Sequence, residues 1–355
     1  MNSELSSQQI QDIGEQGLLE RLQRFCPPEI IGDDAAVLVT APEQSLVVTT
    51  DVLVDGVHFS NLTTSPEDAG WRAAAANLSD LAAMGASPLG ITVGLGLPGE
   101  VRVSWVERLY QGITECLQKY NTSIVGGDVV RSPVTTLAIT AFGQVSPHRI
   151  IRRSAAVVGH AIVITGVHGA SRAGLELLLH PELGQDLKDV EKTDLIRAHQ
   201  RPQPRLDVLP ILQKILNSQS KIVRLSEAKV QNLKSKIPVA GMDSSDGLAD
   251  AIIQICRASN VGAVLQRRQI SLPAAFDHWL TQEQALEYAL YGGEDFELVL
   301  CLPQESASAL VQHLGQGAAI VGKITSGSTV LLHDEEKKFP NQVLSLSQGF
   351  QHFSQ

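Results

Sequence analysis

The segment from Ser65 to Ala86 constrains the fold most, because it predicts a buried helix that carries a carboxylate in its apolar half. Ser65 suits the N-cap, Pro66 the first helical position, and Asp68 lies three residues after the cap. The second half is mostly alanine, leucine and methionine, with Asp80 among them. Burying an isolated charge there is costly, so we expect Asp80 to be paired, hydrogen-bonded or bound to a metal. The structural alternative is a cap on a neighbouring loop.

Length and composition predict two globular domains. The 355 residues are many for one core and suit two. A hydrophobic fraction of 43%, a charged fraction of 19% and a mean hydropathy of +0.05 are typical of soluble globular proteins. The formal net charge of −10 argues against nucleic acid or an anionic membrane as the main partner. An acidic protein that handles phosphate groups usually needs a cation between them.

The cysteines and the N-terminal residues predict a cytoplasmic protein. No two cysteines have the spacing of a metal site or a redox motif, so we expect four reduced core residues: Cys26, Cys116, Cys256 and Cys301. The first residues lack a basic region followed by an apolar run. No segment reaches the apolar length that spans a bilayer.

The order of predicted elements favours an α/β (α+β) fold of two domains, each a mixed β-sheet covered by helices. A boundary near residue 150 separates residues 1–150 from residues 151–355. Strands are expected at 46–51, 91–97, 123–128, 135–145, 161–165 and 296–302. Helices are expected at 6–25 with a break at Gly14, at 66–84, at 104–120, around 174–179 and at 283–290. Residues 217–238 are polar and basic, which indicates a surface insertion.

Acidic side chains recur where the predicted strands and helices end. They are Asp34, Asp51, Asp80, Asp128, Asp243 and Asp246, with hydroxyl groups at Thr49, Thr50, Ser244 and Ser245. Each acid alone could be a cap or a turn residue. Together they offer only oxygen ligands, which suit a hard cation, and Mg²⁺ is usually held by a few carboxylates plus substrate phosphates. The set therefore predicts a site for several Mg²⁺ ions and a polyphosphate.

Two nucleotide-binding patterns in the chain are coincidences. Residues 94–99 fit the dinucleotide fingerprint by letter, but Pro98 interrupts it and no helix is expected to begin at its last glycine. Residues 317–323 resemble a P-loop, but Ile324 replaces the hydroxyl that would bind Mg²⁺.

Seven sequence motifs together give the chain a specific resemblance to a known family. They are Gly32–Ala36, Thr50–Phe59, Asn77–Ala86, Gly126–Asp128, Arg201–Arg205, Asp243–Leu248 and Gly292–Leu298. In this order and spacing the chain resembles the thiamine-monophosphate kinase family over nearly its whole length. Several motifs are shared with a wider aminoimidazole ribonucleotide synthetase-like superfamily, which includes selenophosphate synthetase and hydrogenase-maturation enzymes. Three features favour the kinase family: His58–Phe59, the segment of the central helix that begins with Asn77, and the tail at 349–353.

The resemblance implies roles for particular residues. The implied Mg²⁺ ligands are Asp34, Thr49, Thr50, Asp51, Asp80, Asp128, Asp243 and Asp246. The implied ATP contacts are Gly127, Asp128, Arg153, Ser245 and Tyr110, and the implied thiamine-phosphate contacts are His58, Glu294 and Phe350. A cationic thiazolium ring favours an aromatic face and a nearby carboxylate, which Phe350 and Glu294 could provide.

Three of these assignments have alternatives. Arg149 and Arg152 compete with Arg153 for contact with a phosphate group. His58 could be a loop histidine that packs beside Phe59, and Phe350 could be a tail aromatic buried in the core.

The resemblance also implies a reaction and an assembly. The γ-phosphoryl group of ATP would pass directly to thiamine monophosphate and give thiamine diphosphate and ADP, with several Mg²⁺ ions reducing the repulsion between phosphates. The attacking phosphate oxygen is already ionised at neutral pH, so no catalytic acid or base is expected. Residues 1–150 would bind ATP and Mg²⁺ and form a homodimer, and residues 151–355 would complete the active site.

Two other functions remain open at this point. One is another ATP-dependent synthetase of the superfamily, which the lack of a suitably placed N-terminal cysteine disfavours. The other is a non-catalytic regulatory protein that binds Mg²⁺ and a nucleotide, which the presence of every expected acid disfavours.

Overall fold

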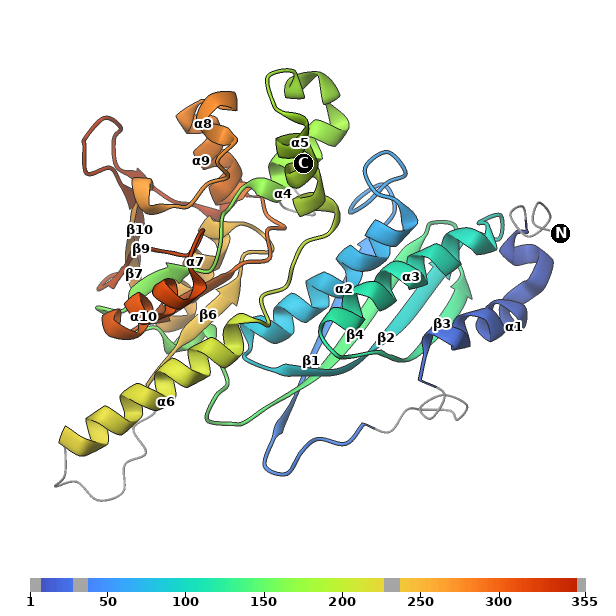
Figure 1. Ribbon diagram of the computed structural model, residues 1–355, viewed down its shortest axis with the longest axis horizontal. Helices are drawn as coiled ribbons and strands as arrows, with labels where there is room; N and C mark the ends of the chain where they lie inside the picture. The colour runs from blue at the N-terminus through green and yellow to red at the C-terminus, as the bar shows by residue number, and fades with distance from the viewer. Residues whose placement is uncertain (1–7, 28–37, 227–236, 350–355) are drawn as a thin grey trace. The chain divides into compact units, whose positions relative to one another are not determined.

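The structure is a computed structural model that describes residues 8–27, 38–226 and 237–349 (Figure 1). It divides into two compact units. The N-terminal unit comprises Met1–Leu81, Ala86–Pro147 and Gln200–Pro202, and the C-terminal unit comprises Ala82–Gly85, His148–His199 and Gln203–Gln355. The main change of unit therefore falls between residues 147 and 148. One short segment before this point, Ala82–Gly85, belongs to the C-terminal unit, and one after it, Gln200–Pro202, belongs to the N-terminal unit.

The N-terminal unit contains a mixed sheet of four strands in the order β1-β4-β2-β3. The strands are β1 (Ser45–Val54), β2 (Ser87–Leu97), β3 (Ile124–Arg131) and β4 (Thr136–Val145). Strand β4 pairs antiparallel with β1 and β2, whereas β2 and β3 are parallel. Burial alternates along β1, with residues 45, 47, 49, 51 and 53 more buried than their neighbours, so the sheet has one covered and one open face.

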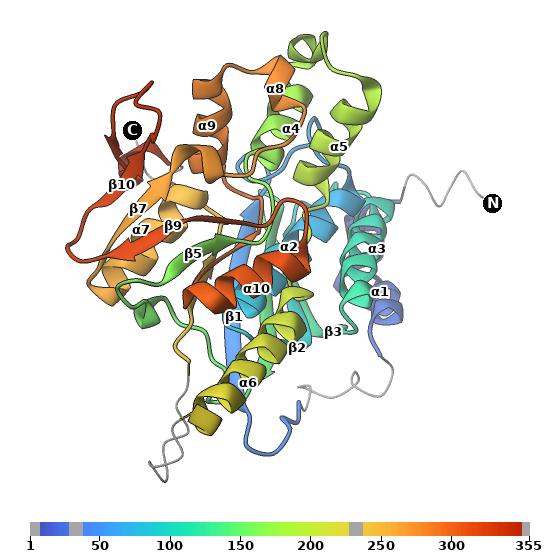
Figure 2. The ribbon, with the colours of Figure 1, turned by 60° about the vertical axis from the view of Figure 1, so that its left-hand side comes forward.

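Helices α2 (Pro66–Ala83) and α3 (Val103–Lys119) cover one face of this sheet (Figures 1 and 2). Helix α1 (Ile10–Leu22) contains the expected break at Gly14, whose φ of +64° is not helical. The predicted helix around Asp80 is confirmed. Ser65 bonds the backbone N–H of Asp68 at 3.2 Å, as an N-cap residue should.

Helices α2 and α3 cross with their backbones in contact, and two glycines make this possible. A Cβ atom at Gly70 would lie 2.0 Å from the carbonyl oxygen of Leu109, and one at Gly112 would lie 1.8 Å from that of Glu67. No side chain fits between the helices at either position. The position of α2 on the sheet therefore depends on this contact.

The C-terminal unit contains a mixed sheet of seven strands in the order β11-β10-β7-β9-β5-β8-β6. The strands are β5 (Ala161–Ile164), β6 (Ala240–Asp243), β7 (Gly262–Gln266), β8 (Leu298–Leu302), β9 (Ala319–Thr325), β10 (Val330–His333) and β11 (Gln342–Val343). The helices are α4 (Ala170–Leu179), α5 (Asp189–Gln200), α6 (Val208–Ser226), α7 (Leu248–Ser259), α8 (Phe276–Trp279), α9 (Gln282–Tyr291) and α10 (Gln304–Leu314). The predicted α/β class with mixed sheets covered by helices is confirmed.

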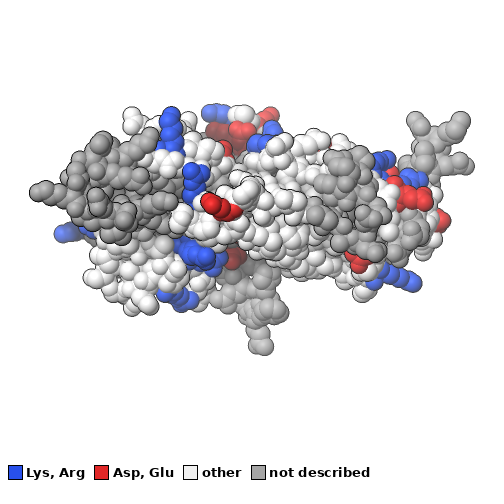
Figure 3. Space-filling view, turned by 90° about the horizontal axis from the view of Figure 1, so that it is seen from below, with Lys and Arg blue, Asp and Glu red and all other residues white. Residues whose placement is uncertain are grey.

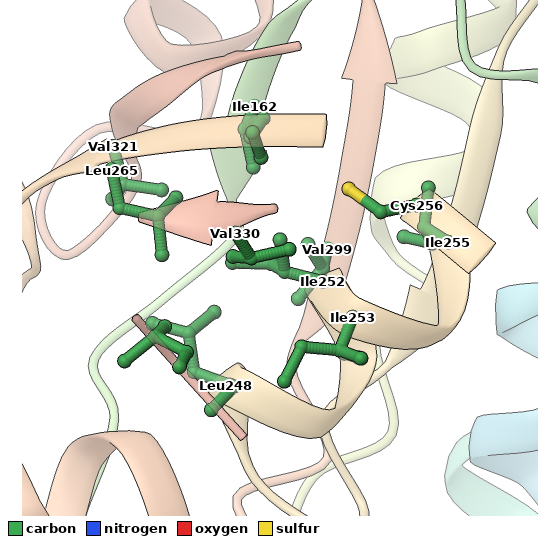
Figure 4. Close-up of a cluster of buried hydrophobic side chains, with 14 of the residues drawn as sticks. Ile162, Leu248, Ile252, Ile253, Ile255, Cys256, Leu265, Val299, Val321 and Val330 are labelled. Carbon is green, nitrogen blue, oxygen red and sulfur yellow. The ribbon is translucent and has the colours of Figure 1, made fainter. Parts of the chain in front are cut away.

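Both faces of the seven-stranded sheet are buried. Alternate residues of β8 enter two clusters: Val299 and Cys301 pack with α7, and Leu298, Leu300 and Leu302 pack with α6 and α10. Figure 4 shows the α7 side, where Leu248 and Ile252 lie among side chains of the strands. A continuous apolar run such as β8 is typical of a strand that is covered on both faces.

Four predicted features differ from the structure. Strand β1 does not end at Asp51 but continues to Val54, and β3 continues beyond Asp128, because both strands remain paired with their neighbours. Strand β8 begins at Leu298 rather than at Phe296, whose φ of +52° excludes it from a strand. Residues 217–226 of the expected insertion continue helix α6.

The four cysteines are reduced, as predicted, but Cys26 is not fully buried as a core residue would be. All four cysteines are thiols, three of them buried and Cys26 half-buried. Within the described ranges, no helix combines the length and the apolar character needed to cross a membrane. The face drawn in Figure 3 carries both acidic and basic side chains, and the basic ones do not form one continuous patch there.

We expect Gly112→Ala to destabilise the protein by about 2 kcal/mol, because the added methyl group forces α2 and α3 apart. Helix propensity alone predicts the opposite, a gain of about 1 kcal/mol. Urea unfolding measures the difference. Gly99→Ala is the control, since its Cβ would have an ordinary 3.5 Å contact with Gln11. A Gly112→Ala protein as stable as wild type would contradict the close crossing.

Candidate functional site

Strand β1 and helix α2 bring three predicted site residues together in the N-terminal unit. Thr49 and Asp51 are two residues apart on β1, so their side chains point to the same, helix-covered face of the sheet. The hydroxyl of Thr49 donates a hydrogen bond to Oδ2 of Asp80 on α2. Two carboxylates and a hydroxyl group from different elements therefore lie near one another.

Thr50 lies on the opposite face of the sheet from Thr49 and Asp51. Its hydroxyl is 2.8 Å from that of Thr140 on β4, and either can be the donor. The side chain of Thr50 therefore does not share a side-chain site with its two neighbours. Only its backbone could contribute there, and its predicted role stays a prediction.

Asp128 lies on the other edge strand of the same sheet. The register aligns Asp51 with Ile139, Ile139 with Val93 and Val93 with Gly127, so Gly127 is in the row of Asp51 and Asp128 is on the opposite face. Three strand spacings separate the two edges, about 14 Å. A Cβ atom at Gly127 would lie 2.3 Å from the carbonyl oxygen of Val93, which only glycine tolerates.

The ring of His58 is held in one orientation by the turn after β1. Its Nδ1 accepts the backbone N–H of Val54 at 3.1 Å, and the backbone N–H of His58 donates to the Val54 carbonyl at 2.9 Å. Gly56 allows the turn, with a φ of +79°. A ring nitrogen that accepts a hydrogen bond carries no proton, so the neutral tautomer of His58 has its proton on Nε2. His58 thus presents an N–H donor.

Tyr110, an expected ATP contact, is buried on α3. Its ring lies 5.6 Å from that of Phe25, and burial raises the pKa of its hydroxyl far above the ordinary value. Within the described structure Tyr110 is a core residue, and its predicted contact with ATP stays a prediction.

In the C-terminal unit, the turn between β6 and α7 carries Asp243, Ser245 and Asp246. Asp243 is buried at the end of β6 and accepts a hydrogen bond of 3.1 Å from the Ser245 hydroxyl, while Asp246 is exposed. Gly247, with a φ of +102°, precedes the first turn of α7. The backbone N–H groups at the start of that helix favour an anion beside the two acids.

The loop at 292–297 is hydrogen-bonded directly to this turn. The N–H of Glu294 donates to the carbonyl of Ser245 at 2.7 Å, and the N–H of Ser244 donates to the carbonyl of Glu297 at 2.9 Å. Glu297 also donates its N–H to the Ser244 hydroxyl at 3.2 Å. The expected ATP contact Ser245 and the expected thiamine contact Glu294 are therefore neighbours within one unit.

The two arginines of the Arg201–Arg205 motif are structural. Arg201 pairs with Asp68 at 2.6 Å and with Glu115 at 2.9 Å in the N-terminal unit. Arg205 pairs with the half-buried Glu297 at 2.6 Å in the C-terminal unit, and its Nη1 donates to the Thr165 carbonyl at 2.7 Å.

The three arginines that compete for a phosphate group differ in their surroundings. Arg149 donates to the side chain of Gln213 on α6 at 2.7 Å. Arg152 and Arg153 are exposed. The charge of Arg153 lowers the pKa of Asp250 on α7, although burial raises that pKa overall, so Arg153 lies near the helix that follows Asp246. This position favours Arg153 over Arg149.

The donor set fits a hard cation in its chemistry. The predicted ligands are carboxylate and hydroxyl oxygens, and Mg²⁺ takes most of its remaining ligands from water and phosphate. In the described part of the chain, no three His, Cys, Asp or Glu side chains are close enough to form a metal site by themselves. Asp34 and Phe350, the other two predicted site residues, lie outside the described residues.

Three residues near Glu294 carry no role predicted from the sequence: Asp295, Ser171 and His199. Asp295 accepts the N–H groups of Gly169 at 2.7 Å and Ser171 at 3.0 Å, and His199 lies within 3.6 Å of Glu294. The second acid of the Gly-Gly-Glu-Asp motif is a signal that could have identified Asp295. Nothing in the sequence links Ser171 or His199 to Glu294.

Comparison with known proteins gives consistent matches along the chain. The AIR synthase related protein N-terminal domain matches residues 32–145, and the corresponding C-terminal domain matches residues 157–334. The thiamine-monophosphate kinase of Synechococcus elongatus is 50% identical over 99% of both chains.

Solved structures give the same result. The thiamine-monophosphate kinase of Stenotrophomonas maltophilia has a TM-score of 0.73 at 30% identity and covers 90% of this chain and 95% of its own. AaThiL complexed with AMPPCP and TMP has a TM-score of 0.68 at 29% identity and covers 94% of this chain and 97% of its own.

The half-buried carboxyl group of Asp295 leads to a prediction about the pH dependence of stability. Burial raises its pKa from 3.8 to about 7; Ser171 and Gly169 lower it, and Glu297 and Glu294 add to the rise. Because the folded-state pKa is the higher one, ionisation destabilises the fold as pH rises from 3.8 to about 7. We expect the wild type to lose up to about 4 kcal/mol relative to Asp295→Asn across this range. Urea unfolding at several pH values measures it, and parallel curves for the two proteins would contradict it.

Proposed function

Because the chain belongs to the thiamine-monophosphate kinase family of AIR synthase related proteins, we propose that it phosphorylates thiamine monophosphate with ATP, giving thiamine diphosphate and ADP. The identity of 50% over 99% of both chains carries the proposal. The complex of a relative with AMPPCP and TMP supports it, since a kinase of this kind must bind an ATP analogue and its acceptor together.

The reaction is a direct in-line transfer between two phosphate-bearing substrates. Several Mg²⁺ ions, when bound, would neutralise the phosphate charges that repel one another. The acceptor oxygen is already ionised at neutral pH, so the protein needs no general base. Its work is to hold the two substrates in line and at a short distance.

In the N-terminal unit, Asp51 and Asp80 would hold cations on the helix-covered face of the sheet, whereas Asp128, on the opposite face of β3, would hold one only at a separate position. The hydrogen bond from Thr49 fixes the Asp80 carboxylate toward β1, on the face of the sheet to which Asp51 also belongs. A carboxylate that is already oriented loses little conformational freedom when it binds a cation. Gly127 is proposed to contact an ATP phosphate through its backbone, and Asp34 is proposed as a further ligand.

In the C-terminal unit, Asp243 and Asp246 would hold a cation next to the N-terminus of α7. Ser245 and Arg153 would contact the ATP phosphates, since a hydroxyl and a guanidinium group both donate to phosphate oxygens. We propose that these residues take part in the same reaction as the acids of the N-terminal unit.

The acceptor would be recognised at both of its ends. The Nε2–H of His58 would donate to the phosphate of thiamine monophosphate, because the Val54 N–H occupies Nδ1. Glu294 would lie beside the cationic thiazolium ring, and Phe350 would contribute an aromatic face.

The open face of the four-stranded sheet supports a homodimer. Leu46, Val48, Val52 and Val130 are exposed on the face that α2 and α3 leave open. Folded monomers rarely expose several large apolar side chains on one sheet face. We propose that a second copy covers them through a two-fold interface.

The purified protein should form thiamine diphosphate and ADP from thiamine monophosphate and ATP when Mg²⁺ is present. Chromatography of the thiamine phosphates measures the product, and removal of Mg²⁺ with EDTA should stop its formation. Lack of product at every Mg²⁺ concentration would refute the proposed function. Phosphate release from ATP without the acceptor would instead favour a synthetase.

Asp80→Asn should lower kcat by about 10³-fold, because an amide cannot replace the negative charge that faces the cation. The amide oxygen still accepts a hydrogen bond from Thr49, so the melting temperature should change little. Asp68→Asn, on the same helix, is the matched control and should keep the wild-type kcat while losing the ion pair with Arg201. A kcat near that of wild type in Asp80→Asn would remove Asp80 from the site.

A further inference from the structure

The backbone around Glu294 is held in an unusual conformation. Gly293, Glu294 and Phe296 have φ values of +70°, +59° and +52°, and the latter two are not glycines. The bond from the Glu294 N–H to the Ser245 carbonyl keeps the loop in place. The Cα of Glu294 is therefore fixed, and the orientation of its carboxylate depends on its side-chain torsions.

One buried imidazole lies beside that carboxylate. His199, at the end of α5, is buried, and its Nδ1 is 3.6 Å from Oε2 of Glu294 and 3.3 Å from the hydroxyl of Ser171. The Glu294 side chain is 35% exposed, so a ligand can reach it. His199 thus contacts Glu294 from the interior of the unit.

Asp295 completes this cluster from the next position in the chain. Its two carboxylate oxygens accept the backbone N–H groups of Gly169 and Ser171 at the start of α4. Ser171 therefore binds Asp295 through its backbone and His199 through its side chain. These contacts fix the imidazole relative to the loop that carries Glu294.

We propose that His199 is a positioning residue, which orients the Glu294 carboxylate toward the cationic ring of the acceptor. The inference rests on the proposed function, because it assumes that Glu294 contacts that ring. If His199 already restricts the side-chain torsions of Glu294, the carboxylate loses less conformational entropy when the acceptor binds. His199 acts through Glu294 and does not touch the phosphates, so it affects the acceptor and not ATP.

The test compares steady-state kinetics of four proteins with wild type. His199→Leu should raise the KM for thiamine monophosphate about tenfold and leave the KM for ATP unchanged. His199→Asn, whose amide N–H can replace the Nδ1–H, should recover most of the loss. Glu294→Gln should raise the same KM, and the double variant His199→Leu/Glu294→Gln should be no worse than Glu294→Gln alone. Additive effects in the double variant would overturn the proposal.

His160→Leu is a matched control for the loss of a buried histidine, because His160 is also buried in this unit. It should lower the melting temperature without changing the KM for thiamine monophosphate. Equal increases in both KM values for His199→Leu would indicate a merely structural role and overturn the inference. If Glu294→Gln alone leaves the acceptor KM unchanged, the role of Glu294 and the inference both fail, whereas an inactive wild type would refute the proposed function itself.

Discussion

The hydrogen bond from Thr49 sets the orientation of the Asp80 carboxylate in the N-terminal unit. It joins helix α2 to the edge strand β1 and makes an acid inside an apolar helix compatible with folding. It can form only because α2 lies where the crossing with α3 places it, and Gly70 and Gly112 permit that crossing. Packing of the helices and orientation of the Asp80 carboxylate are thus two results of one arrangement.

Much of this arrangement could be predicted from local sequence. Ser65, Pro66 and Asp68 mark the start of α2, and the apolar composition around Asp80 indicates that its carboxylate needs a partner. The ends of the strands could not be predicted. Strand β1 extends through Asp51 because β4 pairs with it as far as Val54, and pairing is a property of two distant segments. The same pairing places the side chain of Thr50 on the opposite face of the sheet from that of Thr49, although the two residues are adjacent in the sequence.

The C-terminal unit shows a second limit of sequence reasoning. The acids of the β6–α7 turn and the Gly-Gly-Glu-Asp segment each stand out in the sequence, but their mutual hydrogen bonds through Ser244 and Ser245 do not. Asp295 bonds residues that are more than one hundred positions away in the chain. His199 lies in an amphipathic helix with no motif of its own. Its closeness to Glu294 is a consequence of the tertiary fold alone.

Gly127 shows that strand packing alone can require a residue that also belongs to a functional motif. Its Cβ would lie 2.3 Å from the carbonyl oxygen of Val93, so the parallel pairing of β2 and β3 excludes every other amino acid there. Purifying selection would retain this glycine in any relative that keeps the same strand pairing, whatever it phosphorylates or activates. A glycine at position 127 therefore indicates that a relative has the same strand pairing. Differences in substrate among relatives have to be sought at side chains that the packing of the sheet does not restrict.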